Sequence, residues 1–243
     1  MDKRVLVVEA HPDDVEWYAG GTIACLTRQG CAITLVICTE GERGSYDSAA
    51  SPVILAATRK QEQRAAADFL GIGEIVYLGY PDGQLEPTME LRRELAVLYR
   101  RFKPDLLLTF DPWKRYELHP DHLAAGRAAL DARIVSKMPL FYTHTRALGY
   151  DAWAIPEIWL YNADQPNHYV DVGETLAVRL EALRLHASQN VYGDDSVQYL
   201  TRQAEEAGVR AGCRYAEAFH RIVVEGAIAR SQGDGSIGKE QSF

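Results

Sequence analysis

The sequence has little cysteine, little basic charge and no long apolar run. Its four cysteines form no C-x-x-C pair, so we expect free thiols, and neither a disulfide framework nor a cysteine-rich metal site. Lys and Arg number 26 against 34 Asp and Glu, which gives a formal net charge of −8. Because nucleic-acid binding requires clustered basic residues, this balance argues against a nucleic-acid partner.

The beginning of the chain has no apolar segment long enough for a signal peptide or a membrane span. The first apolar run covers residues 5–8 and polar residues follow soon after it. We therefore expect no integral membrane segment and a cytoplasmic location. A hydrophobic content of 47% and 243 residues suit one large domain, which we assign to residues 1–225. The polar, Gly- and Ser-rich tail at 226–243 is expected to be flexible.

Apolar runs alternate with amphipathic segments along most of the chain. This pattern predicts an α/β, Rossmann-like fold, with a mostly parallel sheet and helices on both faces. The runs are rich in Val, Ile and Leu, which is typical of strands covered on both faces. The expected strands are residues 4–10, 32–40, 74–79, 105–110, 157–161 and 168–172. Helical spacing of Leu91, Leu95 and Leu98 predicts a helix that ends before Pro104.

Four polar segments follow predicted strands. They are residues 11–14, 41–52, 79–87 and 111–120. Because the carboxyl ends of parallel strands meet at one edge of a sheet, we expect these segments to line one crevice.

Two related motifs stand in these segments: His-Pro-Asp-Asp at 11–14 and His-Pro-Asp-His at 119–122. Pro and Asp are ordinary residues at a helix N-terminus, but that role does not explain the histidines. Imidazole and carboxylate groups are the usual Zn²⁺ donors, and a catalytic site uses three protein ligands with one position left for water. His11, Asp14 and His122 would supply such a set. A metal there would lower the pKa of the water to ~7 and favour hydrolysis near neutral pH.

The adjacent carboxylates of Asp13 and Asp14 suggest a division of roles. Neighbouring side chains in a turn point in different directions, so one can bind the metal while the other accepts a proton from water. Sequence spacing does not decide which carboxylate has which role. His119 lies three residues before His122 and is expected to face the same pocket. There it would donate to the oxyanion or to the leaving amine, with Asp121 orienting it.

Several segments together resemble the PIG-L/LmbE-like zinc-dependent de-N-acetylases. They are HPDDVEWYAGGT, EGERGS, HPDH, PNHYVDV, LRLHASQ and AEAFH. The resemblance extends to about Val224. It implies that a metal-bound water removes the acetyl group from an N-acetylglucosaminyl, or amino-sugar, conjugate. It also implies one Zn²⁺ per chain, with Fe²⁺ or Co²⁺ as substitutes, and a homo-oligomer.

The resemblance also assigns residues to roles. It matches the zinc ligands to His11, Asp14 and His122, and the general base to Asp13. His119 takes the acid or oxyanion role, with Asp121 as its partner. Polar positions that face the substrate in the family correspond here to Arg43, Ser45, Arg59 and Asp82.

Some of these positions have alternative interpretations. Arg59 could instead form a solvated pair with Glu62 on a helix face. Trp17 and Tyr18 stand where many relatives have a small glycine. The loop from Trp113 to Tyr116 is also bulkier than in many relatives, so Trp113 either stacks on the substrate or only packs within its loop. His186 is expected to be structural or to lie at the edge of the site.

Two other functions remain open from the sequence. A metal-dependent phosphoesterase also uses histidines and carboxylates, although such enzymes commonly bind two metals. A non-catalytic sugar- or metal-binding homologue is the second alternative. Asp13 argues against it, because a binding protein has no need for a base beside a metal ligand.

Overall fold

The computed structural model describes residues 3–189 and 193–224, so the predicted tail at 226–243 lies outside the described residues. The described chain forms a seven-stranded sheet in the order β3-β2-β1-β4-β5-β7-β6. Its strands are β1 (Arg4–Glu9), β2 (Ala32–Thr39), β3 (Glu74–Tyr80), β4 (Leu106–Phe110), β5 (Glu157–Tyr161), β6 (His168–Asp171) and β7 (Ala216–Val223).

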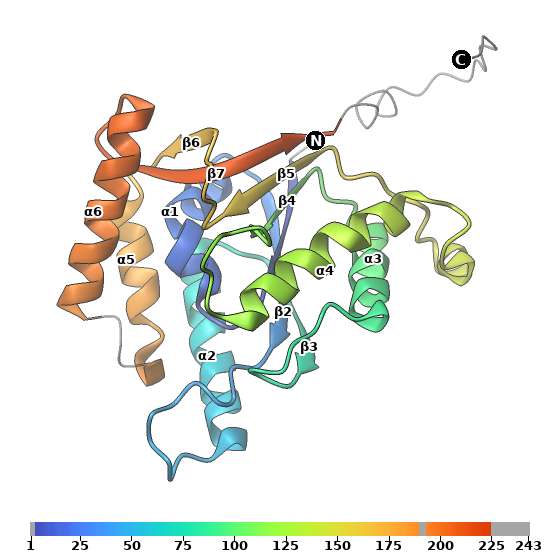
Figure 1. Cartoon of the computed structure of the whole chain (residues 1–243), viewed down its shortest axis with the longest axis horizontal. Coiled ribbons are helices and arrows are strands. Elements are labelled where there is room, and N and C mark those ends of the chain that lie inside the picture. The colour runs from blue at the N-terminus through green and yellow to red at the C-terminus, as the bar shows by residue number, and fades with distance from the viewer. Residues whose placement is uncertain (1–2, 190–192, 225–243) are drawn as a thin grey trace.

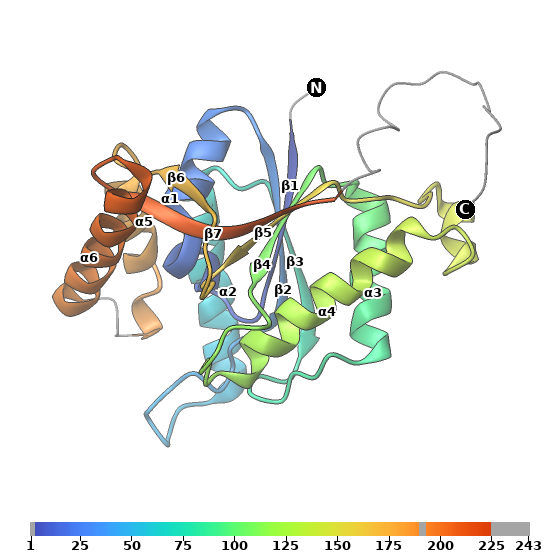
Figure 2. The same cartoon turned by 45° about the horizontal axis from the view of Figure 1, so that its top comes forward.

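Helices cover both faces of this sheet. They are α1 (Asp14–Arg28), α2 (Pro52–Leu70), α3 (Met89–Phe102), α4 (Pro120–Lys137), α5 (Leu176–Arg184) and α6 (Asp194–Ala211). Figure 2 shows α3 and α4 on one side of the sheet and the other four helices on the opposite side. The predicted α/β architecture is therefore confirmed. Within the described residues, no helix is long and apolar enough to cross a bilayer.

The first five strands of the order, β3 to β5, are parallel, while β7 pairs antiparallel with both β5 and β6. All six predicted strands form within about one residue of their predicted ends. The additional strand β7 was not predicted, since its sequence AEAFHRIV has no regular alternation of apolar and polar residues. The expectation that every parallel strand is covered on both faces was wrong for β3. This strand lies at the edge of the sheet and is mostly half-buried.

Buried apolar strands in the centre of the sheet determine where the polar loops meet. Strand β1 lies between β2 and β4, and its residues from Val5 to Glu9 are buried. Helix α4 packs closely over β4, because a Cβ atom on Gly126 would lie 2.5 Å from the carbonyl oxygen of Phe110. Helix α4 also contacts β1, which neighbours β4 in the sheet, and Figure 1 shows α4 next to β4. The two histidine motifs thus share one edge of the sheet.

Candidate active site

The first motif is held in a strained turn between β1 and α1. Asp13 has φ 95°, in the left-handed region that non-glycine residues rarely adopt. Its backbone N–H donates to Oε1 of Gln63 at 2.8 Å. The Oδ2 atom of Asp14 accepts the N–H groups of Ala10 at 3.1 Å and His11 at 2.8 Å. These bonds fix the two neighbouring carboxylates in different surroundings.

The Asp14 carboxylate lies between two histidine rings. Its Oδ2 is 3.4 Å from Nδ1 of His11, and its Oδ1 is 3.3 Å from Nε2 of His122. In a tetrahedral zinc site with bonds of roughly 2.0–2.1 Å, donor atoms lie about 3.3 Å apart. Burial alone would raise the pKa of Asp14, but the rings of His122 and His11 lower it below its usual range. Each of the two histidines thus lies at the spacing of a metal donor from a different oxygen of Asp14, while the role of His11, Asp14 and His122 as the metal ligands stays a prediction.

The outer ring nitrogens of both histidines face further carboxylates. Nε2 of His11 lies 3.2 Å from Asp121 and 3.2 Å from Asp82. Nδ1 of His122 lies 3.5 Å from Glu117, without forming a hydrogen bond. Metal-binding histidines usually have a carboxylate or carbonyl group at the second nitrogen, which orients the ring. His11 follows that pattern, whereas Nδ1 of His122 lies near Glu117 without a hydrogen bond.

Among the described residues, two groups have donor atoms within 4.8 Å of one another, namely His11, His119 and His122, and His11, Asp82 and Asp121; neither contains Asp14. The second group uses the outer nitrogen of His11. Each oxygen of Asp121 accepts one backbone N–H, whereas both backbone N–H groups at Asp14 donate to Oδ2 and none of these bonds uses Oδ1. We favour the set that contains Asp14, because it uses Nδ1 of His11, which faces Asp14, and leaves Nε2 of His11 with Asp82 and Asp121.

Asp121 connects the first motif to the loop between β3 and α3. Its Oδ2 accepts the N–H of Gly83 at 2.7 Å, and its Oδ1 accepts that of Leu85 at 3.1 Å. The carboxylate of Asp121 contacts the ring of His11. The prediction had made Asp121 the partner of His119 instead. The reason is that α4 begins at Pro120. Asp121 is therefore in the helix and completely buried, while His119 precedes it.

His119 is half-buried against the two proposed ligand rings. Its ring is stacked on His122 with centroids 4.5 Å apart, and it meets His11 edge-on at 4.5 Å. Its Nδ1 has no hydrogen-bond partner in the part of the chain that the structure describes. Burial, together with the nearby charges of His11 and His122, lowers the pKa of His119. A neutral ring with an unengaged nitrogen thus lies beside the proposed metal position.

Arg59 supports the carboxylate of Asp13 from α2. The arginine is only 3% exposed, and its Nη2 lies 3.0 Å from Oδ2 of Asp13. It also donates to the backbone carbonyls of Pro12 and Gly41. Glu62 instead accepts two hydrogen bonds from Ser188, both of 2.7 Å. The alternative of a solvated Arg59 and Glu62 pair is therefore excluded.

Among the other residues predicted to face the substrate, Asp82 is buried against His11, while Arg43, Ser45 and Trp113 lie farther out. The backbone N–H of Arg43 donates to Asp82 at 2.9 Å, and its side chain reaches the Asp82 carbonyl at 2.7 Å. Ser45 is exposed in the same loop. Trp113 is 62% exposed. A role in substrate binding stays a prediction for all five residues, Arg43, Ser45, Arg59, Asp82 and Trp113.

Sequence reasoning missed a buried polar cluster behind the first motif. The Nε2 of Gln63 donates to Oε1 of Glu16 at 2.8 Å, and Oε2 of Glu16 lies 3.6 Å from Nε2 of His186. His186 is 1% exposed, in line with its predicted structural role. Gln63 belongs to no motif and lies 50 residues from Asp13, so the sequence contains no local signal for this contact.

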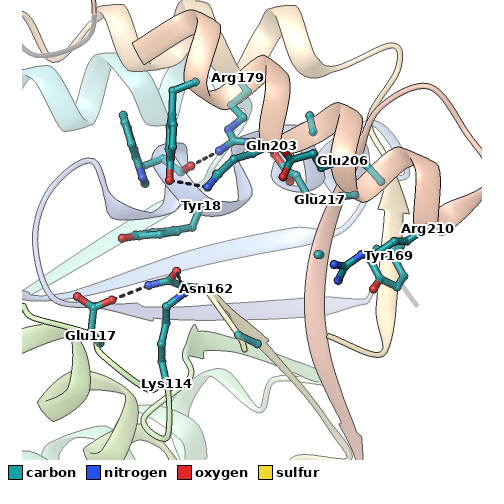
Figure 3. A pocket seen from close by; sticks show the side chains of 17 residues that line it. Tyr18, Lys114, Glu117, Asn162, Tyr169, Arg179, Gln203, Glu206, Arg210 and Glu217 are labelled. Carbon is teal, nitrogen blue, oxygen red and sulfur yellow. Dashed lines mark hydrogen bonds and ion pairs between the residues drawn. The ribbon is translucent and has the colours of Figure 1, made fainter. Parts of the chain in front are cut away.

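A cavity of about 490 Å³ lies near the site; no histidine lines it, but its lining residues Tyr18 and Glu117 lie close to His122. It extends from Tyr18 and Glu117 to α6, as Figure 3 shows. The ring of Tyr18 meets that of His122 edge-on, with centroids 6.1 Å apart. The site thus combines a buried ionic centre with an adjacent open space.

Known proteins are similar to this chain in sequence and in fold. A diacetylchitobiose deacetylase of Thermococcus kodakarensis is 35% identical over 90% of this chain and 83% of its own. A probable N-acetyl-alpha-D-glucosaminyl L-malate deacetylase 2 of Bacillus anthracis is 34% identical over 77% of this chain and 82% of its own. The solved N,N'-diacetylchitobiose deacetylase of Pyrococcus horikoshii superposes with a TM-score of 0.86 at 34% identity, over 91% of this chain and 84% of that one.

Residues 6–133 match the family model of PIG-L, described as GlcNAc-PI de-N-acetylase. This match covers more than half of the chain and includes both histidine motifs. The resemblance inferred from those motifs is therefore confirmed, and the chain belongs to the PIG-L family of de-N-acetylases.

Proposed function

We propose that this protein is a metal-dependent hydrolase that removes the N-acetyl group from an amino-sugar conjugate. The observation that carries the proposal is the separation of the two neighbouring carboxylates. Asp14 faces the rings of His11 and His122, while Asp13 faces Arg59. Similarity to deacetylases that act on N-acetylglucosaminyl compounds supports the substrate class.

His11, Asp14 and His122 are the residues that would hold the metal. Their nitrogen and oxygen donors suit Zn²⁺ first, with Fe²⁺ or Co²⁺ as substitutes. When bound, such an ion lowers the pKa of a water molecule and polarises the acetyl carbonyl. Asp82 and Asp121 keep the ring of His11 oriented through its Nε2, and Glu117 lies 3.5 Å from Nδ1 of His122.

Asp13 acts as the general base in this proposal. Its carboxylate accepts a proton from the attacking water while a bond forms between the water oxygen and the acetyl carbon. The C–N bond then breaks, and the proton passes to the leaving amine, which yields acetate and a free amino sugar. Arg59 and the hydrogen bond from the Asp13 N–H to Gln63 hold the base in its strained conformation.

His119 stabilises the negative charge that develops on the carbonyl oxygen. The lowered pKa of its ring favours the neutral form, which still has one N–H to donate. This feature supports the oxyanion role over the acid role, because a neutral imidazole has no easily released proton. Asp121 affects this step only through His11, which it contacts directly.

The two alternative functions have less support. A two-metal phosphoesterase would need a second complete set of ligands, whereas the groups found among the described residues share His11. A non-catalytic binding protein would not need a strained carboxylate beside the proposed metal, since residues in such conformations cluster at active sites.

The test is release of acetate and amine from a panel of N-acetylglucosamine conjugates, with added Zn²⁺ and with a chelator. We expect turnover that the chelator stops and that Zn²⁺ restores. Phosphate release from model esters would support the phosphoesterase instead. A folded, zinc-loaded protein that releases acetate from no member of the panel would contradict the proposal.

A further inference from the structure

The peptide group between Pro12 and Asp13 is held from both sides by side chains of α2. Its carbonyl oxygen accepts from Nη2 of Arg59 at 2.6 Å, and its N–H donates to Oε1 of Gln63 at 2.8 Å. Arg59 and Gln63 lie one turn apart on α2, so both reach the peptide from the same face of the helix. Asp13 itself has φ 95°. The two side chains therefore fix the peptide plane from which the strained Asp13 residue continues.

The side-chain amide of Gln63 can hold this peptide in only one orientation. Because the N–H of Asp13 can only donate, the amide must present its oxygen to it, which leaves Nε2 on the other side. There Nε2 donates to Oε1 of Glu16 at 2.8 Å. An ionised carboxylate only accepts, so a flipped amide would place two donors together at Asp13 and two acceptors together at Glu16. Glu16 thus determines the orientation of the amide that holds Asp13.

Burial makes these hydrogen bonds difficult to replace. Glu16 and Gln63 are 0% exposed, so a lost partner leaves a polar group away from solvent. The second oxygen of Glu16, Oε2, lies 3.6 Å from Nε2 of His186. Burial alone would lower the pKa of His186, but the carboxylate of Glu16 raises it above its usual value, so a cation faces the buried carboxylate. These residues and Asp13 form one continuous chain of buried contacts.

This chain of contacts leads to the proposed base and not to the proposed metal position. Gln63 accepts the N–H of Asp13. The neighbouring Asp14 instead faces the rings of His11 and His122. A change in the chain should therefore displace the Asp13 carboxylate while the proposed ligands stay in place. Because a displacement of about 1 Å can cost ~10²-fold in rate, the expected signature is a lower kcat at unchanged metal content.

We propose that Glu16 and Gln63 are positioning residues for the general base, with Glu16 setting the orientation of the Gln63 amide and the amide fixing Asp13. The inference rests on the proposed function, in which Asp13 accepts the proton of water. It extends that function to two buried residues that act on the reaction only through Asp13. Gln63 belongs to α2 and Glu16 to the first turn of α1, so the packing of these two helices becomes part of the catalytic geometry.

The first experiment exchanges the two side chains. Glu16→Gln replaces a group that only accepts by one that also donates, and Gln63→Glu places two carboxylates against each other. Each single change should lower kcat by roughly tenfold with KM and metal content unchanged. The double variant again has one amide that donates to one carboxylate, and the other oxygen of that carboxylate accepts the N–H of Asp13. It should turn over roughly tenfold faster than either single variant.

Two further variants serve as a control and as a safeguard. Gln61→Glu adds the same charge on the exposed face of α2 and should leave kcat unchanged. Gln63→Met keeps the length of the side chain without its acceptor and should lower kcat as Gln63→Glu does, which covers a failure of Gln63→Glu to fold. Unchanged kcat in Glu16→Gln and Gln63→Met, in an enzyme that depends on Asp13, would overturn the inference alone. A double variant no faster than the single variants would do the same.

Hydrogen exchange of the Asp13 N–H, followed by NMR, is a measurement that needs no turnover. Exchange should be faster in Glu16→Gln and in Gln63→Glu than in the wild type, and slow again in the double variant. This pattern, in a protein whose wild type releases acetate from no N-acetyl sugar, would support the placement of Asp13 and contradict the proposed function. Equal exchange in all of these proteins would show that the amide of Gln63 does not hold Asp13.

Discussion

The two histidine motifs share one sheet edge but are held very differently. In the first motif the carboxylates of Asp13 and Asp14 are buried and receive hydrogen bonds from the backbone and from Arg59. In the second motif the Nδ1 atoms of His119 and His122 have no hydrogen bond with the described residues. The loop before it is also open, with Tyr116 86% exposed.

This difference suggests that the two regions have different effects on the reaction and on substrate preference. The first motif follows the central strand β1, where packing on both sides can keep a base and a ligand in place. The second motif, which supplies the proposed ligand His122, follows an exposed loop whose Lys114 and Glu117 line the cavity. Substitutions in the first motif should therefore affect chemistry, and substitutions near the second should affect substrate preference.

The largest effect is expected for Asp14→Ala. Loss of the carboxylate between His11 and His122 removes one of the three proposed ligands, so metal binding should weaken strongly. Activity should fall by more than the ~10²–10⁴-fold that is typical for loss of a general base, and excess Zn²⁺ should restore part of it. Metal content by elemental analysis and kcat/KM with added zinc measure both effects. Full metal content in this variant would show that Asp14 is not a ligand.

Asp13→Asn should have the next largest effect. The amide keeps the size of the side chain but cannot accept the proton of water, so kcat should fall by ~10²–10⁴-fold while metal content stays near one per chain. Asp47→Asn is the control, because Asp47 lies exposed in the loop after β2. If Asp13→Asn lost its metal, or turned over at the wild-type rate, the roles of the two carboxylates would have been assigned wrongly.

Gln63→Leu tests whether the rigidity of the first motif matters. The buried N–H of Asp13 would lose its acceptor, which costs about 1–3 kcal/mol. We expect a lower free energy of unfolding and a kcat reduced by roughly tenfold, with metal still bound. Gln61→Leu is a matched control on the exposed face of α2. A variant that is less stable but fully active would limit Gln63 to a structural role.

The smallest effect is expected for Trp113→Ala in the loop before the second motif. Loss of one aromatic contact is worth about 0.5–1.5 kcal/mol, so KM for the best substrate should rise roughly two- to tenfold with metal content unchanged. Steady-state kinetics across the conjugate panel would detect this change or a shift in preference. If neither KM nor preference changed, Trp113 would only pack within its loop.

Much of the fold could be predicted because its signals are local. Apolar runs in β1, β2 and β4 and the helical spacing in α3 are visible in short windows of sequence. Strand β7 was missed because tertiary contacts with β5 and β6 stabilise a segment that has weak local pattern. The edge position of β3 likewise depends on strand order, which no short window contains.

The sequence by itself determined where six of the strands lie along the chain, the two motifs that follow strands and the types of donor groups that are available. Tertiary structure alone decided which groups meet. Asp121 contacts His11, 110 residues away, and Gln63 reaches Asp13 across 50 residues. The physical reason is that a hydrogen bond depends on distances within about 3 Å, and long-range packing sets these distances independently of sequence separation.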